Sequence, residues 1–157
     1  MYNHTPEQYE NPFARIVKKE PTVKNGDQEP YVFYRDDYLT AFISTKQWPN
    51  NPGNALVIPN EVHENLYDIP DDLLVKIHLF SKRLALAMKD IYQCDGISVR
   101  QHNEPAGNQE VWHYHLHVFP RYKDDYLYTL HKYSHDADLD IRLNYAVKLK
   151  DYFSKNN

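Results

Sequence analysis

The stretch that decides the fold reads Trp112-His113-Tyr114-His115-Leu116-His117-Val118-Phe119-Pro120-Arg121. Histidine occupies every second position at its centre, and apolar or aromatic residues stand between the histidines. Because side chains alternate between the two faces of a β-strand, this pattern predicts a strand over 112–119 with the three histidines along one face. We expect Tyr114, Leu116 and Val118 to point the other way, into a buried core.

Three imidazoles in one row suit the chemistry of phosphate esters. Each can donate or accept a proton near pH 7, and an imidazole nitrogen can attack phosphorus while its neighbours hold the non-bridging oxygens. The product of such an attack is a phosphoramidate that water can open. From the residues alone, a metal site or an ordinary half-exposed strand face stays open as an alternative.

The rest of the chain has the spacing of short strands and two helices. Leu73, Ile77, Phe80 and Leu84 recur at helical intervals after Pro70, which predicts one long helix. In chain order we expect a helix over 6–18, a hairpin of strands over 31–37 and 38–44, a loop over 48–54, a strand over 54–59, a helix over 70–92, strands over 96–102 and 112–119, and a helix over 138–153. This order is typical of an α+β fold with a mostly antiparallel sheet of about five strands.

Length and composition indicate one domain over residues 1–157. With 4 glycines and no glycine-rich phosphate loop, side chains must carry any phosphate site. A net charge of −4 with mixed acids and bases argues against nucleic acid or a membrane surface as a partner. The single Cys94 excludes a disulfide within the chain and a zinc site of two cysteines. No apolar run approaches the ~18 residues of a membrane span, so we expect a cytoplasmic protein.

The histidine pattern and its flanks resemble the histidine triad (HIT) family, whose signature is His-φ-His-φ-His-φ-φ with φ apolar. Residues 113–119 match the signature, and Pro120-Arg121 follows as in the family. The resemblance divides the chain into a HIT-like core over about 11–121 and a C-terminal extension over 122–157. The other segments that carry it are Asn11-Pro12-Phe13-Ala14-Arg15-Ile16-Val17, Asp36-Asp37-Tyr38-Leu39-Thr40-Ala41-Phe42, Pro52-Gly53-Asn54-Ala55-Leu56-Val57-Ile58-Pro59, and the loop and strand over 101–117.

The resemblance implies a nucleotide hydrolase or nucleotidyl transferase that works through a covalent nucleotidyl-histidine intermediate. His115 would be the nucleophile, and His117 would support the phosphate and the leaving group. His113 would orient the nucleophile, with its backbone carbonyl taking the proton on the far imidazole nitrogen. The implied substrates are purine nucleotides, such as adenosine phosphoramidates, aminoacyl adenylates or dinucleoside polyphosphates, and no cofactor or metal is implied. The substrate-binding residues carried over from the family are Gln101, Phe13, Ile16, Phe42, Ser44 and Asn54.

The sequence departs from the family pattern at several positions. Asn54 stands where the family has the histidine of Pro-Gly-His, so a group that titrates near neutrality is replaced by an amide that cannot carry a proton. Ser44 replaces an acid or amide used on the ribose. The loop before the triad is one residue longer than usual, so we expect Glu110 to be a solvated loop acid. His131 and His135 are expected at the surface rather than as metal ligands.

Two other functions stay open. One is a metal-binding, cupin-like protein in which the three histidines are ligands, and the other is a nucleotide-binding sensor without turnover, which Asn54 keeps open. The resemblance further implies a homodimer paired across the helix over 70–92 and a sheet edge. The wide apolar stripe of that helix and the tyrosines after Arg121 agree with such an interface, although the tail over 122–157 can equally pack on its own domain.

Overall fold

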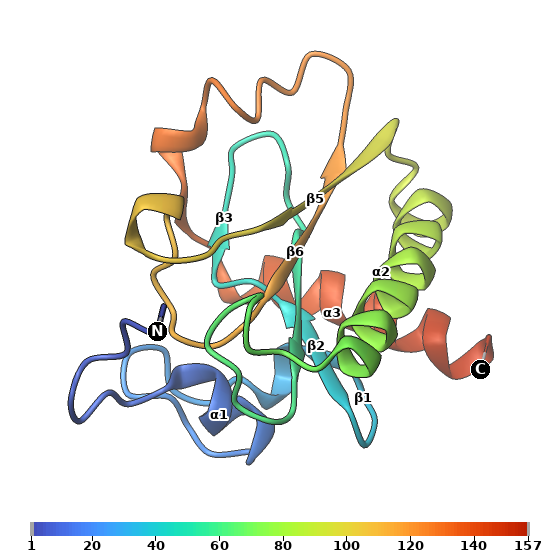
Figure 1. Ribbon diagram of the computed structural model, residues 1–157. Helices are drawn as coiled ribbons and strands as arrows, with labels where there is room; N and C mark the ends of the chain where they lie inside the picture. Colours follow the sequence, from blue (N-terminus) through green and yellow to red (C-terminus); the bar gives the residue numbers. More distant parts are fainter. Residues whose placement is uncertain (1, 157) are drawn as a thin grey trace.

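A computed structural model describes residues 2–156. Its centre is an antiparallel sheet of five strands in the order β1-β2-β4-β6-β5 (Figure 1). The strands are β1 (Val32–Arg35), β2 (Leu39–Ile43), β4 (Ala55–Pro59), β5 (Gly96–Gln101) and β6 (Leu116–Arg121). Together with the helices α2 (Asp71–Tyr92) and α3 (Leu139–Lys155), this sheet confirms the α+β fold expected from the sequence.

The two faces of the sheet have different covers. One face packs under α2 and α3 and forms the main core, with Ala41, Val57, Leu116 and Val118 from the strands. The opposite face carries the alternate residues of the same strands. At the β1–β2–β4 end it is covered by the short helix α1 (Pro12–Val17). At the β6–β5 end it carries His117, and the candidate site therefore lies on the face that the long helices leave free.

The expected hairpin and the long helix are both present. Asp36 turns the chain between β1 and β2 by accepting backbone hydrogen bonds from Tyr38 and Leu39 at 2.8 Å. α2 begins after Pro70 with two aspartates in its first turn, where negative charge complements the helix dipole. It ends at Gln93, which takes the left-handed conformation that stops a helix. Within residues 2–156, no helix is both long and apolar enough to span a membrane.

Three expectations about local structure were wrong or incomplete. The helix expected over 6–18 is only α1, because Asn11 precedes a proline, stays extended and caps the helix. The strand expected over 112–119 begins only at Leu116. A short ribbon of β3 (Lys46–Gln47) and β7 (His135–Asp136) was not expected, because two-residue strands leave no pattern in a sequence.

The C-terminal helix packs on its own domain. Phe153 of α3 stacks on Phe80 of α2 with ring centroids 5.3 Å apart, and both belong to the main core. Arg142 is buried and donates to the Ile43 carbonyl at 2.8 Å, which ties α3 to the end of β2. Tyr145 of the same helix packs so close to Gly53 that a Cβ there would lie 2.6 Å from its ring. The helix therefore supports the loop over 48–54.

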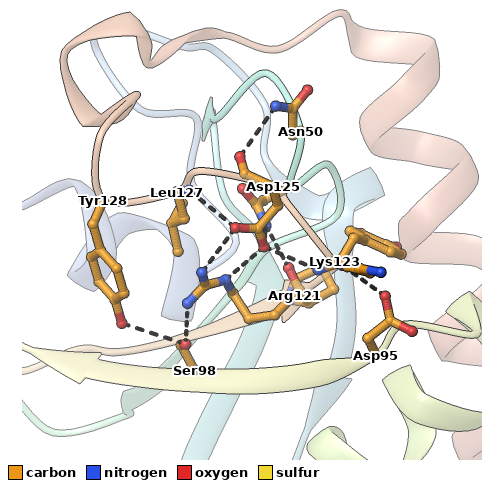
Figure 2. A network of polar contacts seen from close by, with 11 residues as sticks. Asn50, Asp95, Ser98, Arg121, Lys123, Asp125, Leu127 and Tyr128 are labelled. Atoms are coloured by element: carbon orange, nitrogen blue, oxygen red, sulfur yellow. Dashed lines mark hydrogen bonds and ion pairs between the residues drawn. The ribbon is translucent and has the colours of Figure 1, made fainter.

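A buried carboxylate fixes the chain where it leaves β6 (Figure 2). Asp125 accepts two hydrogen bonds from Arg121, at 2.6 and 2.8 Å. It also accepts from the backbone nitrogens of Tyr122 and Leu127, both at 3.0 Å, and from the Asn51 amide at 2.7 Å. The Arg121 guanidinium holds the pKa of this carboxyl well below its usual range. One side chain thus joins β6, the segment after it and the loop over 48–54.

We predict that Asp125→Asn destabilises the protein by about 2–4 kcal/mol, because it leaves Arg121 without its charged partner and places an NH2 group against donors. The stabilisation that Asp125 provides is present above the pKa of an unfolded aspartate, near 3.9, and is lost as the pH falls through the lower folded value. The wild type should therefore lose this advantage over the variant only in strong acid. Urea unfolding at several pH values measures both effects.

Asp124→Asn is the matched control, since Asp124 is the exposed neighbour. Its unfolding midpoint should stay close to that of the wild type. An Asp125→Asn variant as stable as this control at pH 7 would contradict the role given to Asp125.

Candidate active site

The three histidines lie at and just before the start of β6. Only His117 belongs to the strand, and His113 and His115 lie in the segment that leads into it. The segment bends because the His113 backbone nitrogen donates to the Val111 carbonyl at 2.9 Å. The predicted alternation still holds, since Tyr114, Leu116 and Val118 are all buried in the main core.

His113 has a partner at each ring nitrogen. Its Nε2 lies 2.9 Å from the Pro59 carbonyl, and its Nδ1 lies 3.2 Å from the Asn11 side-chain nitrogen. A carbonyl can only accept and an amide nitrogen can only donate, so Nε2 carries the proton and Nδ1 holds the lone pair. Burial lowers the pKa of His113 to about 4, which keeps the ring neutral at pH 7. The ring is therefore fixed in orientation and tautomer.

His115 is oriented by its predecessor in the triad. Its Nδ1 donates to the His113 carbonyl at 2.7 Å, so the lone pair resides on Nε2. Burial lowers the pKa of His115 to about 4, so that at pH 7 the imidazole is neutral. A neutral ring with its free lone pair on one defined nitrogen has the properties of a nucleophile.

His117 lies next to His115, with ring centroids 5.0 Å apart, and stacks on Phe119 at 5.7 Å. Its pKa is well below the usual range, first because of burial and then because of the nearby His115 and Arg100. Its Nδ1 is buried and has no hydrogen-bond partner among the described residues. This nitrogen is therefore available for a group that the protein itself does not supply.

A fourth histidine, which the sequence analysis missed, borders the triad. The rings of His102 and His117 are 5.8 Å apart and nearly perpendicular. His102 Nδ1 donates to the Gly107 carbonyl at 2.7 Å, which leaves its Nε2 with a lone pair. His102 directly follows β5, and the antiparallel pairing of β5 with β6 brings it to the triad. Only knowledge of that pairing could have revealed it.

The apolar residues expected around the nucleoside do come together. Phe13, Ile16 and Phe42 form one buried cluster on the site face. The Phe13 ring lies 5.6 Å from that of Phe42 and 5.2 Å from that of His115, in edge-on contact. Phe13 thus links this cluster to the triad.

Of the polar residues expected in the substrate site, Ser44 and Asn54 lie together, whereas the Gln101 side chain has other hydrogen-bond partners. Ser44 and Asn54 are buried neighbours, since the Ser44 backbone nitrogen donates to the Asn54 carbonyl at 3.1 Å. The side chain of Asn54 is fully buried, and neither its Oδ1 nor its Nδ2 has a hydrogen-bond partner among residues 2–156. Gln101 pairs with Leu116 across β5 and β6, but its side-chain amide exchanges hydrogen bonds with the Asn103 side chain at 2.7 and 2.9 Å rather than with a triad histidine. Glu110 is exposed.

The described residues do not form a metal site. Within residues 2–156, no group of three or more histidine, cysteine, aspartate or glutamate side chains is arranged to hold a metal ion. His113 already uses both ring nitrogens, which weighs against the cupin-like alternative. An open cavity of about 460 Å³ lies beside Asn11 and Trp112, and none of the three triad histidines lines it.

Comparisons with known proteins identify the family of this chain. The HIT domain family matches residues 25–124, and the chain therefore belongs to this family of histidine triad proteins. An adenosine 5'-monophosphoramidase of Saccharomyces cerevisiae is 36% identical over 110 residues, which are 69% of this chain and 61% of that protein. A bis(5'-adenosyl)-triphosphatase of the same organism is 32% identical over 95 residues, 59% of this chain and 44% of that one.

Solved structures with a similar fold belong to HIT-like proteins as well. The crystal structure of a Hit-like protein from Bartonella henselae superimposes with a TM-score of 0.73 at 29% identity, covering 91% of this chain and 97% of that chain. The five-stranded antiparallel sheet and its helices are thus the fold of HIT-like proteins.

We predict that Asn11→Asp raises the pKa of His113 above its wild-type value of about 4. A carboxylate would then face Nδ1 while the Pro59 carbonyl still faces Nε2, and only the doubly protonated imidazole can donate to both acceptors at once. NMR titration of the histidine rings measures the change. Because the wild-type pKa lies below the unfolded value of about 6.5, wild-type stability falls as the pH drops from 6.5 towards 4, and the variant should lose less over this range.

Asn11→Ser is the control, since serine can still cap α1 but brings no charge. The prediction fails if the aspartate and serine variants give the same His113 titration curve.

Proposed function

We propose that this protein hydrolyses or transfers nucleotides through a covalent nucleotidyl-His115 intermediate. The observation that carries the proposal is the hydrogen bond from His115 Nδ1 to the His113 carbonyl, 2.7 Å long, which leaves the lone pair of His115 on Nε2. Kinship with a phosphoramidase and a triphosphatase of adenosine nucleotides supports the reaction type.

The proposed reaction has two steps. In the first, His115 Nε2 attacks the α-phosphorus and a P–N bond forms. The bond to the leaving group breaks and its electron pair stays with the leaving atom, which departs as a phosphate anion or, after taking up a proton from water, as a neutral amine. The ring then carries a positive charge, which the His113 carbonyl stabilises through the Nδ1 proton. In the second step water or another acceptor attacks the same phosphorus, the P–N bond breaks, and neutral His115 returns. His117, 5.0 Å away between ring centroids, is the group we assign to the phosphate oxygens and the leaving group.

The base of the substrate is proposed to lie against Phe13, Ile16 and Phe42. These residues form an apolar cluster beside His115, and aromatic edges and faces are suitable partners for a purine ring. We propose adenosine nucleotides with an amine or a phosphate as leaving group. Ser44 and Asn54, buried at the ends of β2 and β4, are proposed as polar neighbours of the bound nucleotide.

We predict that His115→Ala reduces turnover of adenosine 5'-phosphoramidate and diadenosine triphosphate by at least 1,000-fold, on the order of the loss seen when a nucleophile is removed. Nucleotide binding, measured by calorimetry, should change far less. Rapid quenching of the wild type in alkaline denaturant, which preserves the acid-labile P–N bond, should yield protein carrying an adenylyl group on His115, detected by mass spectrometry.

His78→Ala, at an exposed position of α2, is the control and should keep full turnover. A His115→Ala variant with more than a few per cent of the wild-type rate would contradict the proposal. Nucleotide binding by the wild type without any turnover would instead select the sensor alternative.

We also propose that the protein forms a homodimer through α2 and the edge strand β5. Val75, Leu79 and Leu86 make an apolar stripe along the outer side of α2 and are 55%, 60% and 58% exposed. β5 is the last strand of the sheet, with no strand of residues 2–156 paired to its outer edge, and Val99 on this strand is 45% exposed. An apolar stripe beside an unpaired strand edge is the kind of surface that a second copy covers.

We predict that light scattering at micromolar concentration gives about twice the 18.7 kDa chain mass. Leu79→Glu should reduce this to the mass of one chain, because it buries a charge at the interface. Val23→Glu changes an exposed valine in a turn that belongs to neither α2 nor β5, and this variant should remain dimeric. A monomeric wild type would refute the dimer.

A further inference from the structure

Arg100 is an arginine without a polar partner beside the triad. It lies on β5 directly opposite His117 of β6, so both side chains point to the site face. No carboxylate or carbonyl among residues 2–156 accepts from its guanidinium, and its Nε is buried without a partner. Burial lowers the pKa of Arg100, as expected for a cation that is withdrawn from water without a counter-charge.

Aromatic rings hold this guanidinium in place. Its carbon lies 4.2 Å from the centre of the Phe119 ring and 5.4 Å from that of Trp48. Phe119 stacks in turn on His117. These contacts fix the position of the charge but satisfy none of its five N–H donors, which bind oxygen atoms best.

The surroundings of Arg100 contain donors and no free acid. The Trp48 indole nitrogen, like His117 Nδ1, is buried and has no hydrogen-bond partner in the part of the chain that the structure describes. Asp125 is fully engaged by Arg121 and by backbone nitrogens, so it does not neutralise Arg100. The other charged and titratable groups that act on Arg100 are Arg121 and Tyr128. The local balance therefore favours an anion.

Arg100 lies at the end of the triad away from the proposed base site. Phe13 and its cluster contact His113 and His115, whereas Phe119 and Arg100 lie beyond His117. A substrate whose base rests on Phe13 and whose α-phosphate faces His115 would extend its leaving group towards His117 and then Arg100.

We propose that Arg100 binds a phosphate of the leaving group, and so makes this chain selective for nucleotide anhydrides over phosphoramidates. This inference rests on the proposed nucleotidyl transfer to His115. A leaving nucleoside diphosphate carries charge beyond the bridging oxygen, which a guanidinium can bind with two hydrogen bonds. An amine leaving group carries none, and for it Arg100 has nothing to bind.

The experiment compares two substrates in the intact chain of residues 1–157. In Arg100→Met, kcat/KM for diadenosine triphosphate should fall about 10- to 100-fold, the size expected for losing a charge-assisted hydrogen bond. For adenosine 5'-phosphoramidate it should change less than about threefold. Arg100→Lys should lie between wild type and Arg100→Met, since it keeps the charge but not the planar fork. Lys150→Met removes a positive charge from α3 on the opposite face and should change neither substrate.

An equal loss on both substrates, or no loss on the anhydride, would overturn the proposal. Calorimetry with inorganic pyrophosphate gives a readout that does not need turnover: Arg100→Met should bind it at least about 10-fold more weakly than the wild type. A wild type that hydrolyses neither substrate would contradict the proposed function, and the pyrophosphate measurement would then decide the role of Arg100 separately. Unchanged pyrophosphate binding in a folded Arg100→Met variant would refute it.

Discussion

The hydrogen bond from His115 Nδ1 to the His113 carbonyl is the interaction on which the site depends. An imidazole has two similar nitrogens, and only a fixed partner decides which of them carries the proton. Here the partner is a backbone carbonyl, which cannot change its protonation. The carbonyl is itself held in place because the ring of the same residue is bound on both sides, by Asn11 and by the Pro59 carbonyl. Loss of either ring contact would loosen the donor–acceptor pair that prepares His115.

The two faces of the sheet have separate roles: one packs the core, and the other presents the histidines. Side chains of β2, β4 and β6 alternate between an apolar core and the site face. Leu116 and Val118 therefore pack in the core and hold the strand in place, while His117 between them faces the site. Burial of the triad has a second effect. It lowers the pKa of His113 and of His115 to about 4, and the rings therefore stay neutral over the whole physiological range of pH.

The sequence allowed the fold and the triad to be predicted because both are encoded in local patterns. The alternation around His115 and the helical spacing of residues 70–92 needed no knowledge of distant contacts. Asn11, His102 and Arg100 were not recognised. Each lies beside a triad histidine that is either far away in the chain or on a neighbouring strand. The length of the helix at residues 6–18 was overestimated, because apolar spacing was given more weight than the proline that follows Asn11.

The C-terminal segment takes part in shaping the site although it carries no triad residue. Asp125 binds Asn51 as well as Arg121, and thereby fixes the loop over 48–54 relative to β6. That loop supplies Trp48, which packs on Phe119 at 5.0 Å, and it ends at the buried Asn54. The position of Arg100 over Phe119 and Trp48 thus depends on a carboxylate that lies outside the site. The surroundings of the last triad histidine are accordingly set by the loop over 48–54 and by the segment after β6, as well as by the strand that carries the triad.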